Sequence, residues 1–375
     1  ITLDSSQNVT AENNLTVDGN LTVSGTTTIS GYHPTTSRSN KNLMFNGAMQ
    51  VAQRGTSQTS VEGIQGYTTV DRFSLAWSGA NNIIEAHQRA LTSSDTGPWA
   101  KGFRYAYKLV NGNQSSADAG DFVQIVQSLE AQDIACSGWD YTSTSSYITY
   151  SFWVKSSKAQ NFYGSFESVD GTTKRYIYET GSLTANTWTK VTKTIPGASG
   201  LQFDLNAERG LTIYLFPFIG TNLTASNTLN TWANSTGTNY ANNTSSDWWL
   251  ENDATFEITG VQLEVGNVAT DFEHISYGDE LARCQRYYEG VYMTDGTASF
   301  KGYASYGSNA NFEYQFAVHK RARPTWSLEG NASWAGATPN AYESTSSCMF
   351  QVNDGTLFSL GDSADDLCGS FSCEL

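Results

Sequence analysis

Few residues in this chain have the types and spacing that catalysis or metal binding requires. The four histidines, His33, His87, His274 and His319, form no HExxH or similar ligand spacing, so each is interpreted as a polar loop or strand residue. No GxSxG elbow and no glycine-rich phosphate loop followed by a helix occurs. We therefore expect no catalytic residue, no bound metal and no cofactor, and we predict that the protein is not an enzyme.

One acidic segment is compatible with sugar chemistry. Asp247, Glu251 and Asp253 flank the pair Trp248-Trp249, and a pair of carboxylates is all that a glycosidase needs. No spacing in this segment marks an acid and a nucleophile, and the alternative is a solvated acidic loop.

Aromatic residues are the better candidates for binding. Exposed tryptophan and tyrosine rings stack on sugars while neighbouring amides and carboxylates bind the hydroxyls. The following aromatics lie in surroundings rich in Asn, Ser and Gly and are our candidate ligand-binding residues: Tyr303, Tyr306, Trp334, Tyr342, Trp232 and Trp248. The alternative for each is core or intersubunit packing. Four other tryptophans lie in or beside strands and are assigned to the core: Trp77, Trp139, Trp153 and Trp188.

The composition indicates a β protein. The chain has 375 residues, 13% of them aromatic and only 15% charged, and its net charge is −15. Acidic proteins lack the basic patches that bind nucleic acid or anionic membranes, so neither is expected as a partner. The five cysteines are odd in number and irregularly spaced, which fits assembly in a reducing cytoplasm. Cys136 and Cys284 are predicted to be buried.

Most of the chain reads as short strands between Gly, Ser and Asn turns. Residues 42–276 are predicted to form a jelly-roll β-sandwich. Its clearest strands are 103–110, 122–128, 147–154, 188–195, 211–219 and 256–265. Residues 150–154 and 213–219 are apolar on both faces and should be central. The polar excursion 220–253 is long for a compact domain, and such loops are usually either functional or disordered.

Hexapeptide repeats occupy the N-terminal end. Residues 14–31 read NLTVDG, NLTVSG and TTTISG, with apolar side chains on one face of each strand. One such ribbon cannot bury enough apolar surface to offset the entropy of ordering it. We therefore predict that residues 1–33 form an intertwined β-shaft with identical chains in a homotrimer. The alternatives are a single-chain β-solenoid cap and a loose linker.

The remaining segments complete the predicted organisation. Residues 34–41 form a polar joint between the shaft and the sandwich. Residues 277–289 carry the one persuasive helical pattern, with Gly278-Asp279 as N-cap. Residues 290–375 return to β character and are predicted to form a small C-terminal tip domain. Asp71-Arg72, in the segment YTTVDRF, is interpreted as a structural turn.

Three segments together carry a family resemblance. NLMFNGAMQVAQRGTS at 42–57, ITGVQLEVGNVATDFEHISYGDELARCQRYYE at 258–289 and FAVHKRARPTW at 316–326 resemble phage tail fibre and receptor-binding proteins. The sandwich also resembles the carbohydrate-binding modules of glycoside hydrolases. Those modules hold a structural calcium, and Asn46-Gly47 and Glu264 match their pattern, whereas Ala48-Met49-Gln50 lacks the expected glutamate.

The resemblance implies a phage tail fibre adhesin that attaches the virion to a host cell-surface receptor, a glycan or a protein. It implies other phage tail proteins as partners through an N-terminal anchor, assembly in the host cytoplasm, and a place in the virion. Two alternatives remain open, a polysaccharide-depolymerising tail spike and a structural head fibre without receptor binding.

Overall fold

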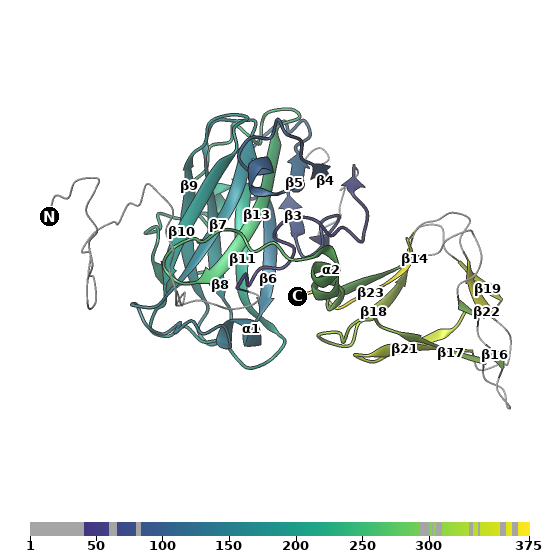
Figure 1. Cartoon of the computed structure of the whole chain (residues 1–375). Helices are drawn as coiled ribbons and strands as arrows, with labels where there is room; N and C mark the ends of the chain where they lie inside the picture. The colour runs from purple at the N-terminus through teal and green to yellow at the C-terminus, as the bar shows by residue number, and fades with distance from the viewer. Residues whose placement is uncertain are drawn as a thin grey trace, which may run out of the picture. The chain divides into compact units, whose positions relative to one another are not determined.

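Two antiparallel sheets packed face to face make up the larger part of the structure (Figure 1). The computed structural model describes residues 41–59, 66–79, 84–292, 300–301, 303–304, 310–329, 333–336, 338–352, 358–361 and 367–375. The predicted shaft, 1–33, and almost all of the predicted joint, 34–41, lie outside the described residues. No helix within the described ranges is long and apolar enough to cross a membrane.

The first sheet has six strands and the second has seven. In spatial order, the first contains β1 (Ser57–Gln58), β4 (Glu85–Ala90), β5 (Tyr105–Val110), β13 (Thr255–Val265), β7 (Tyr147–Ser156) and β10 (Thr189–Pro196). The second contains β12 (Trp232–Asn234), β9 (Lys174–Ser182), β8 (Asn161–Ser168), β11 (Arg209–Ile219), β6 (Phe122–Glu130), β3 (Ser74–Ser78) and β2 (Gly66–Tyr67). The prediction of an all-β sandwich is confirmed.

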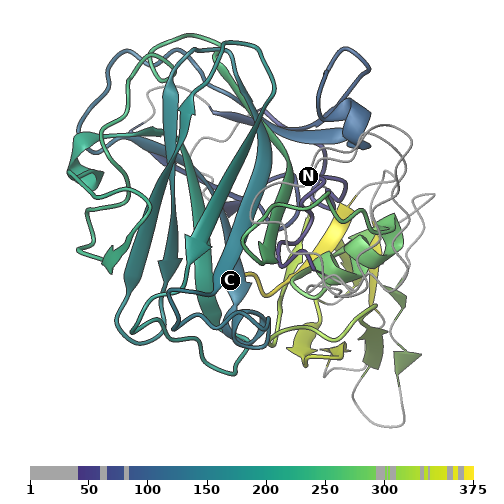
Figure 2. The same ribbon diagram turned by 60° about the vertical axis from the view of Figure 1, so that its left-hand side comes forward.

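Strand alternation separates the core from the outer face of each sheet. In β7, Ile148, Tyr150, Phe152 and Val154 belong to the main hydrophobic core. The intervening side chains, including Trp153, therefore point to the outer face of the six-stranded sheet. Strands β7 and β11 lie in the interior of their sheets, as the apolar runs 150–154 and 213–219 predict. Figure 2 shows the long strands of the sandwich, blue to green, from another side.

The excursion 220–253 packs against the outer face of the seven-stranded sheet. Tyr240 and Ala241 contact the cluster that includes Tyr214 and Phe216 of β11. The guanidinium carbon of Arg175 lies 3.7 Å from the centre of the Tyr240 ring. Within this segment, the short helix η2 (Thr221–Leu223) and β12 supply regular structure. The excursion is thus a covering layer with its own hydrogen bonds.

The segment NLMFNG clamps the N-terminal edge of the sandwich onto β13. Asn42 donates through Nδ2 to Val261 O at 3.1 Å and accepts from Leu263 N at 3.0 Å. A Cβ on Gly47 would lie 2.0 Å from Val261 O, so only glycine permits this approach. Asn46, at φ 55°, binds the backbone of Val51 through both side-chain atoms.

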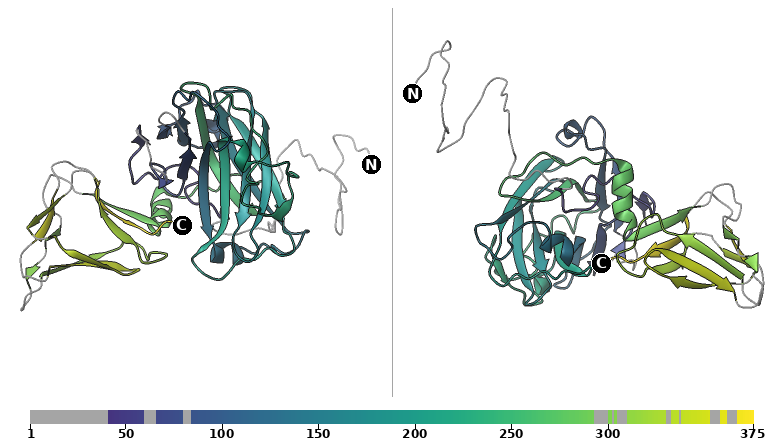
Figure 3. Two further views of the ribbon diagram at one scale, coloured as in Figure 1. Left: turned by 180° about the vertical axis from the view of Figure 1, so that it is seen from behind. Right: turned by 60° about the horizontal axis from the view of Figure 1, so that its bottom comes forward.

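Helix α2 (Tyr277–Gln285) follows the sandwich and corresponds to the helix expected at 277–289. It ends earlier than expected, because β14 (Tyr288–Tyr292) begins three residues later. Its N-cap is Ser276, whose Oγ accepts from Asp279 N at 3.2 Å, and not the Gly278-Asp279 pair. Figure 3 shows this helix in green; in sequence it follows the last strand of the sandwich and precedes the C-terminal strands.

Three small sheets contain the strands described after α2. One joins β14, β23 (Leu367–Ser372) and β18 (Thr325–Leu328). A second joins β15 (Phe300–Lys301), β22 (Phe358–Gly361) and β19 (Ser333–Gly336). A third joins β16 (Tyr303–Ala304), β17 (Ala310–Gln315), β21 (Ser347–Val352) and β20 (Asn340–Glu343). Their shared core includes Phe350, Leu360 and Phe371.

Charged groups link the sandwich to residues near the C-terminus. Arg72 is fully buried, donates to Ser128 O at 2.7 Å and pairs with Glu374. Its guanidinium carbon lies 3.5 Å from the centre of the Tyr287 ring. Asp71 accepts from Gln53 N at 3.0 Å and lies 3.6 Å from Arg54, which also pairs with Glu374 at 3.1 Å. Asp71-Arg72 is therefore structural, as the sequence predicts.

A second ionic contact joins the end of β6, just before the short helix α1 (Ala131–Ala135), to the end of α2. Arg286 donates to both carboxylate oxygens of Glu130 at 2.8 Å, and the Tyr287 hydroxyl donates to Glu130 at 2.7 Å. Asp133, in the first turn of α1, lies near this group. Burial and the neighbouring Glu130 carboxylate raise the pKa of Asp133 to about 6. A carboxyl group whose pKa is raised on folding favours the folded state only below its ordinary pKa.

We therefore expect Asp133→Asn to raise the free energy of unfolding by about 1–2 kcal/mol at pH 7.5 and to change it little at pH 4. The pKa of Asp133 is higher in the folded state than in the unfolded state. The stability that protonated Asp133 contributes to the folded state is therefore lost as pH rises through about 6. Urea unfolding at both pH values measures the difference. The matched control is Asp247→Asn at an exposed loop position, which should change neither value. A destabilised Asp133→Asn variant at pH 7.5 would contradict the prediction.

Candidate functional site

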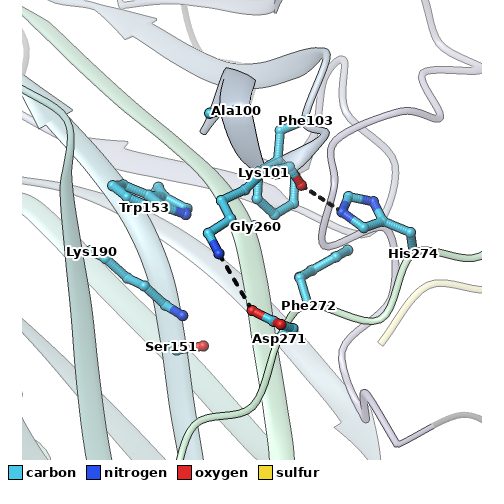
Figure 4. Close-up of a pocket in the computed structure, with 10 residues that line it drawn as sticks. All are labelled: Ala100, Lys101, Phe103, Ser151, Trp153, Lys190, Gly260, Asp271, Phe272 and His274. Carbon is cyan, nitrogen blue, oxygen red and sulfur yellow. Dashed lines mark hydrogen bonds and ion pairs between the residues drawn. The ribbon is translucent and has the colours of Figure 1, made fainter. Parts of the chain in front are cut away.

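A hollow of about 280 Å³ opens on the outer face of the six-stranded sheet. Ser151 and Trp153 of β7, Lys190 of β10 and Gly260 of β13 form its floor. Lys101 and Phe103, from the turn after helix η1 (Trp99–Lys101), and the segment 271–274 form its walls. Figure 4 shows the ammonium groups of both lysines and the Asp271 carboxylate directed into the same space, with the Trp153 indole beside it.

Strand register and a bulge create this hollow. Lys190 pairs with Trp153 and Thr192 pairs with Ser151 on neighbouring strands, which places these side chains side by side on one face. The β13–β7 pairing shifts between Thr259 and Gln262, where Gly260 has φ 63°. A Cβ at Gly260 would lie 2.6 Å from the Phe103 ring. Glycine therefore allows both the backbone conformation and the close approach of Phe103.

The aromatic wall is built from two segments far apart in sequence. The rings of Phe103 and Phe272 lie 4.8 Å apart, edge to face, and His274 lies 5.1 Å from Phe103. His274 Nε2 lies 2.9 Å from Lys101 O. Since a carbonyl oxygen only accepts, this nitrogen carries the proton and Nδ1 remains an acceptor. The bond fastens the segment 271–274 to the turn after η1.

An ionic network fixes the sheet face next to the hollow. Arg89 donates to Asp95 at 2.7 Å and to Glu257 at 2.5 Å, and Lys155 lies 3.1 Å from Glu257. The Trp188 indole donates to Asp95 at 3.0 Å. Burial alone would raise the pKa of Asp95, but the hydrogen bonds from Arg89 and Trp188 outweigh it and hold this pKa well below its usual range. The network keeps Asp95 ionised and holds Trp188 and Lys155 in place.

The charge of the hollow is the opposite of that of the chain. Lys190 is exposed, and its ammonium group has no hydrogen-bond or ion-pair partner among the described residues. Lys101 lies 3.6 Å from Asp271, but their side chains are 62% and 95% exposed, so this pair is weak. Lys41 donates to the backbone oxygen of the same Asp271 at 2.6 Å. The described lining of the hollow thus carries two lysines and one aspartate, in a protein of net charge −15.

Two of the predicted binding residues lie in or on the core of the sandwich. Trp248 is fully buried, and its indole donates to Thr255 O at 3.0 Å. Its neighbour Trp249 is equally buried and stacks on Phe218 at 4.9 Å. Because both rings are buried, neither has a face free for a ligand. Trp248 therefore serves core packing, the alternative stated for it in the sequence analysis. Trp232 is half-buried, packs on Tyr176 at 5.4 Å and donates to Pro196 O at 2.8 Å.

The other predicted binding residues belong to the C-terminal sheets. Trp334 is half-buried against Phe350, with 5.4 Å between the ring centres, and Tyr342 is 46% exposed. Tyr303 lies in β16, and nothing is described of its side chain, while Tyr306 lies outside the described residues. The four candidates of the C-terminal segment therefore remain a prediction, and the hollow contains none of the six.

Sequence reasoning missed the hollow because its aromatic residue resembled a core residue. Trp153 lies in the apolar run YITYSFWV, and we assigned it to the core together with Trp139 and Trp188, which are buried. Trp153 is half-buried and lines the hollow. One signal could have found it. With Ile148, Tyr150, Phe152 and Val154 pointing inward, strict alternation places Trp153 on the opposite face.

Polar side chains that match the calcium pattern already have protein partners. Glu264 accepts from Thr270 N and Gln262 Nε2, both at 2.8 Å. Asn46 is occupied by the backbone of Val51 and Asp71. Within the described ranges, no three His, Cys, Asp or Glu side chains come together as metal ligands would. Cys284 is buried as predicted, but Cys136 is exposed, because it lies at the C-terminal end of the short surface helix α1.

No family model matches the chain, and no curated protein matches it. Solved structures with some similarity include an enzymatically active domain of tailspike protein 4 from bacteriophage CBA120, at 12% identity and TM-score 0.32 over 60% of this chain and 22% of that one. A putative sugar-binding protein from Bacteroides thetaiotaomicron has 10% identity and TM-score 0.32 over 60% and 100% of the two chains. A family 11 carbohydrate-binding module from Clostridium thermocellum has 12% identity and TM-score 0.26 over 58% and 98%.

Proposed function

We propose that this protein is a phage tail fibre adhesin that attaches the virion to a host cell-surface glycan, and that the hollow on the six-stranded sheet binds a sugar. The observation that carries the proposal is an aromatic ring beside polar groups that line a recess of about 280 Å³. An indole edge, a serine hydroxyl, two ammonium groups and a histidine nitrogen converge there. This combination of a ring with few polar groups suits a sugar.

The recess is held rigid, which favours binding. Trp153 belongs to a cluster with Phe103, Leu91 and Trp188, and a Cβ on Gly97 would lie 2.8 Å from its ring. The hydrogen bond from His274 to Lys101 O ties the wall to the turn after η1. Because these groups are already ordered, a ligand loses less free energy in ordering them. Avidity of three copies in the proposed homotrimer would compensate for a weak single site.

The attachment role rests on the sequence resemblance described above and on the hexapeptide repeats. We propose that residues 1–33 form the trimeric shaft, that further tail proteins bind N-terminal to it, and that the mature protein belongs to the virion after assembly in the host cytoplasm. The hollow would then bind a glycan of the host cell surface.

Microbial glycan-array binding of the purified protein tests the proposal, with Trp153→Ala and Trp334→Ala as a matched pair. Loss of a hot-spot aromatic typically costs about 2 kcal/mol, roughly a thirtyfold loss of affinity. We expect this loss for Trp153→Ala and unchanged binding for Trp334→Ala, with circular dichroism confirming that both variants fold. The reverse result would place recognition in the tip. Shortening of a bound polysaccharide would favour a depolymerising spike, and absence of any glycan binding would favour a structural fibre.

A further inference from the structure

Uncompensated positive charge is concentrated at the hollow. Lys190 is exposed and, among the described residues, unpaired, and its ammonium group points into the recess (Figure 4). Lys101 has only the solvated Asp271 carboxylate as partner, at 3.6 Å. Two further cations of this face, Arg89 and Lys155, are held by Asp95 and Glu257. Among the described residues, Lys190 and Lys101 are the two cations that line the hollow.

Resting on the function proposed above, we infer that the hollow selects acidic saccharides, sugars that carry an anionic group such as a carboxylate. In this arrangement the anion binds between Lys190 and Lys101 and displaces Asp271, which is 95% exposed and free to move into solvent. The sugar ring lies against Trp153, and the Ser151 hydroxyl and His274 Nδ1 are left for sugar hydroxyls. A neutral sugar would leave the two ammonium groups unmatched.

The surroundings favour this selection electrostatically. The chain as a whole carries a net charge of −15 and repels anions at long range. The locally cationic recess would attract an anion that the rest of the protein repels. Among the described residues, Asp271 is the only carboxylate that lines the hollow. Glu264 of β13 accepts from Thr270 N, and Glu273 of the segment 271–274 accepts from Asn42 N, each at 2.8 Å. Salt should weaken the interaction because both lysines face solvent.

The test compares methyl β-D-glucuronide with methyl β-D-glucoside, which differ in the carboxylate alone. Binding is followed through the Trp153 indole N–H signal in NMR, assigned with Trp153→Phe. We expect the glucuronide to bind about fivefold more tightly at low salt. Lys190→Gln, or 0.5 M NaCl, should remove that preference. Lys193→Gln is the matched control on the same strand and should preserve it.

Each outcome separates this inference from the function on which it rests. Preferential binding of the glucuronide that depends on Lys190 supports acid selection. Equal affinities for both sugars overturn acid selection and leave glycan binding at the hollow intact. If neither sugar moves the Trp153 signal at concentrations of tens of millimolar, both proposals fail. A glucuronide preference that survives Lys190→Gln also overturns the inference, since the charge would then act elsewhere.

Discussion

Replacing Arg72 with methionine is expected to lower the free energy of unfolding by about 3 kcal/mol. Removing one partner of a buried ion pair typically costs about 3–5 kcal/mol, because the other charge stays buried without compensation. Arg72 is fully buried, and it contacts Glu374, Ser128 O and the Tyr287 ring. Arg54 remains 3.1 Å from Glu374, which puts the expected loss at the lower end of the range.

Chemical denaturation at pH 7.5 measures this loss. Arg323→Met is the matched control, because Arg323 pairs with Glu343 at 3.2 Å but is 68% exposed, and exposed pairs contribute about 0–1 kcal/mol. Glu374→Gln keeps the hydrogen-bonding shape and removes the charge. The double variant should lose less stability than the sum of the losses of Glu374→Gln and Arg72→Met, because the two residues contact each other. A loss below 1 kcal/mol for Arg72→Met would show that the pair does not hold the sandwich to the C-terminal residues.

Replacing Leu21 and Val23 with aspartate is expected to convert the proposed trimer to monomers and to lower the apparent affinity for a glycan-coated surface by about 10²–10⁴-fold. The alternation of the second hexapeptide repeat predicts both side chains on its apolar face, and a buried charge without a partner would prevent three chains from sharing a core. Each monomer would then bind through a single site. Sedimentation velocity measures the mass, and surface plasmon resonance on a dense glycan surface measures the avidity.

Thr22→Asp is the matched control for the proposed shaft, since the sequence alternation predicts Thr22 on the opposite face of the same repeat. It should preserve both the trimer and the avidity. A wild-type chain that sediments as a monomer would contradict the intertwined shaft. A double variant that stays trimeric would show that the apolar face of these repeats is not what holds the chains together.

The strands of the sandwich could be predicted because local pattern and tertiary environment agree. The runs 147–154 and 256–265 alternate in hydrophobicity or are apolar throughout, and they form β7 and β13. The turn at Asp71-Arg72 was also assigned correctly as structural. Strands such as β8 and β9 contain more polar residues and are recognisable only through pairing with β11 and with each other.

The candidate site could not be predicted because exposure depends on partners distant in sequence. Trp248 and Trp249 lie in a polar acidic loop, yet Phe218 and the backbone near Ser116 and Thr255 cover them. Conversely, Trp153 lies in an apolar run, and the hollow beside it exists because a bulge at Gly260 and the segment 271–274 meet there. The polar residues next to these tryptophans in sequence therefore did not indicate whether the rings are exposed in the folded protein.

The crystal structure of the protein with the oligosaccharide that binds best on the array tests glycan binding at the hollow most directly. We predict a sugar ring against Trp153, with hydroxyls within hydrogen-bonding distance of Ser151 or His274 and an anionic group near Lys190. Density for the oligosaccharide at Trp334 and Tyr342, with an empty recess on the six-stranded sheet, would contradict this account.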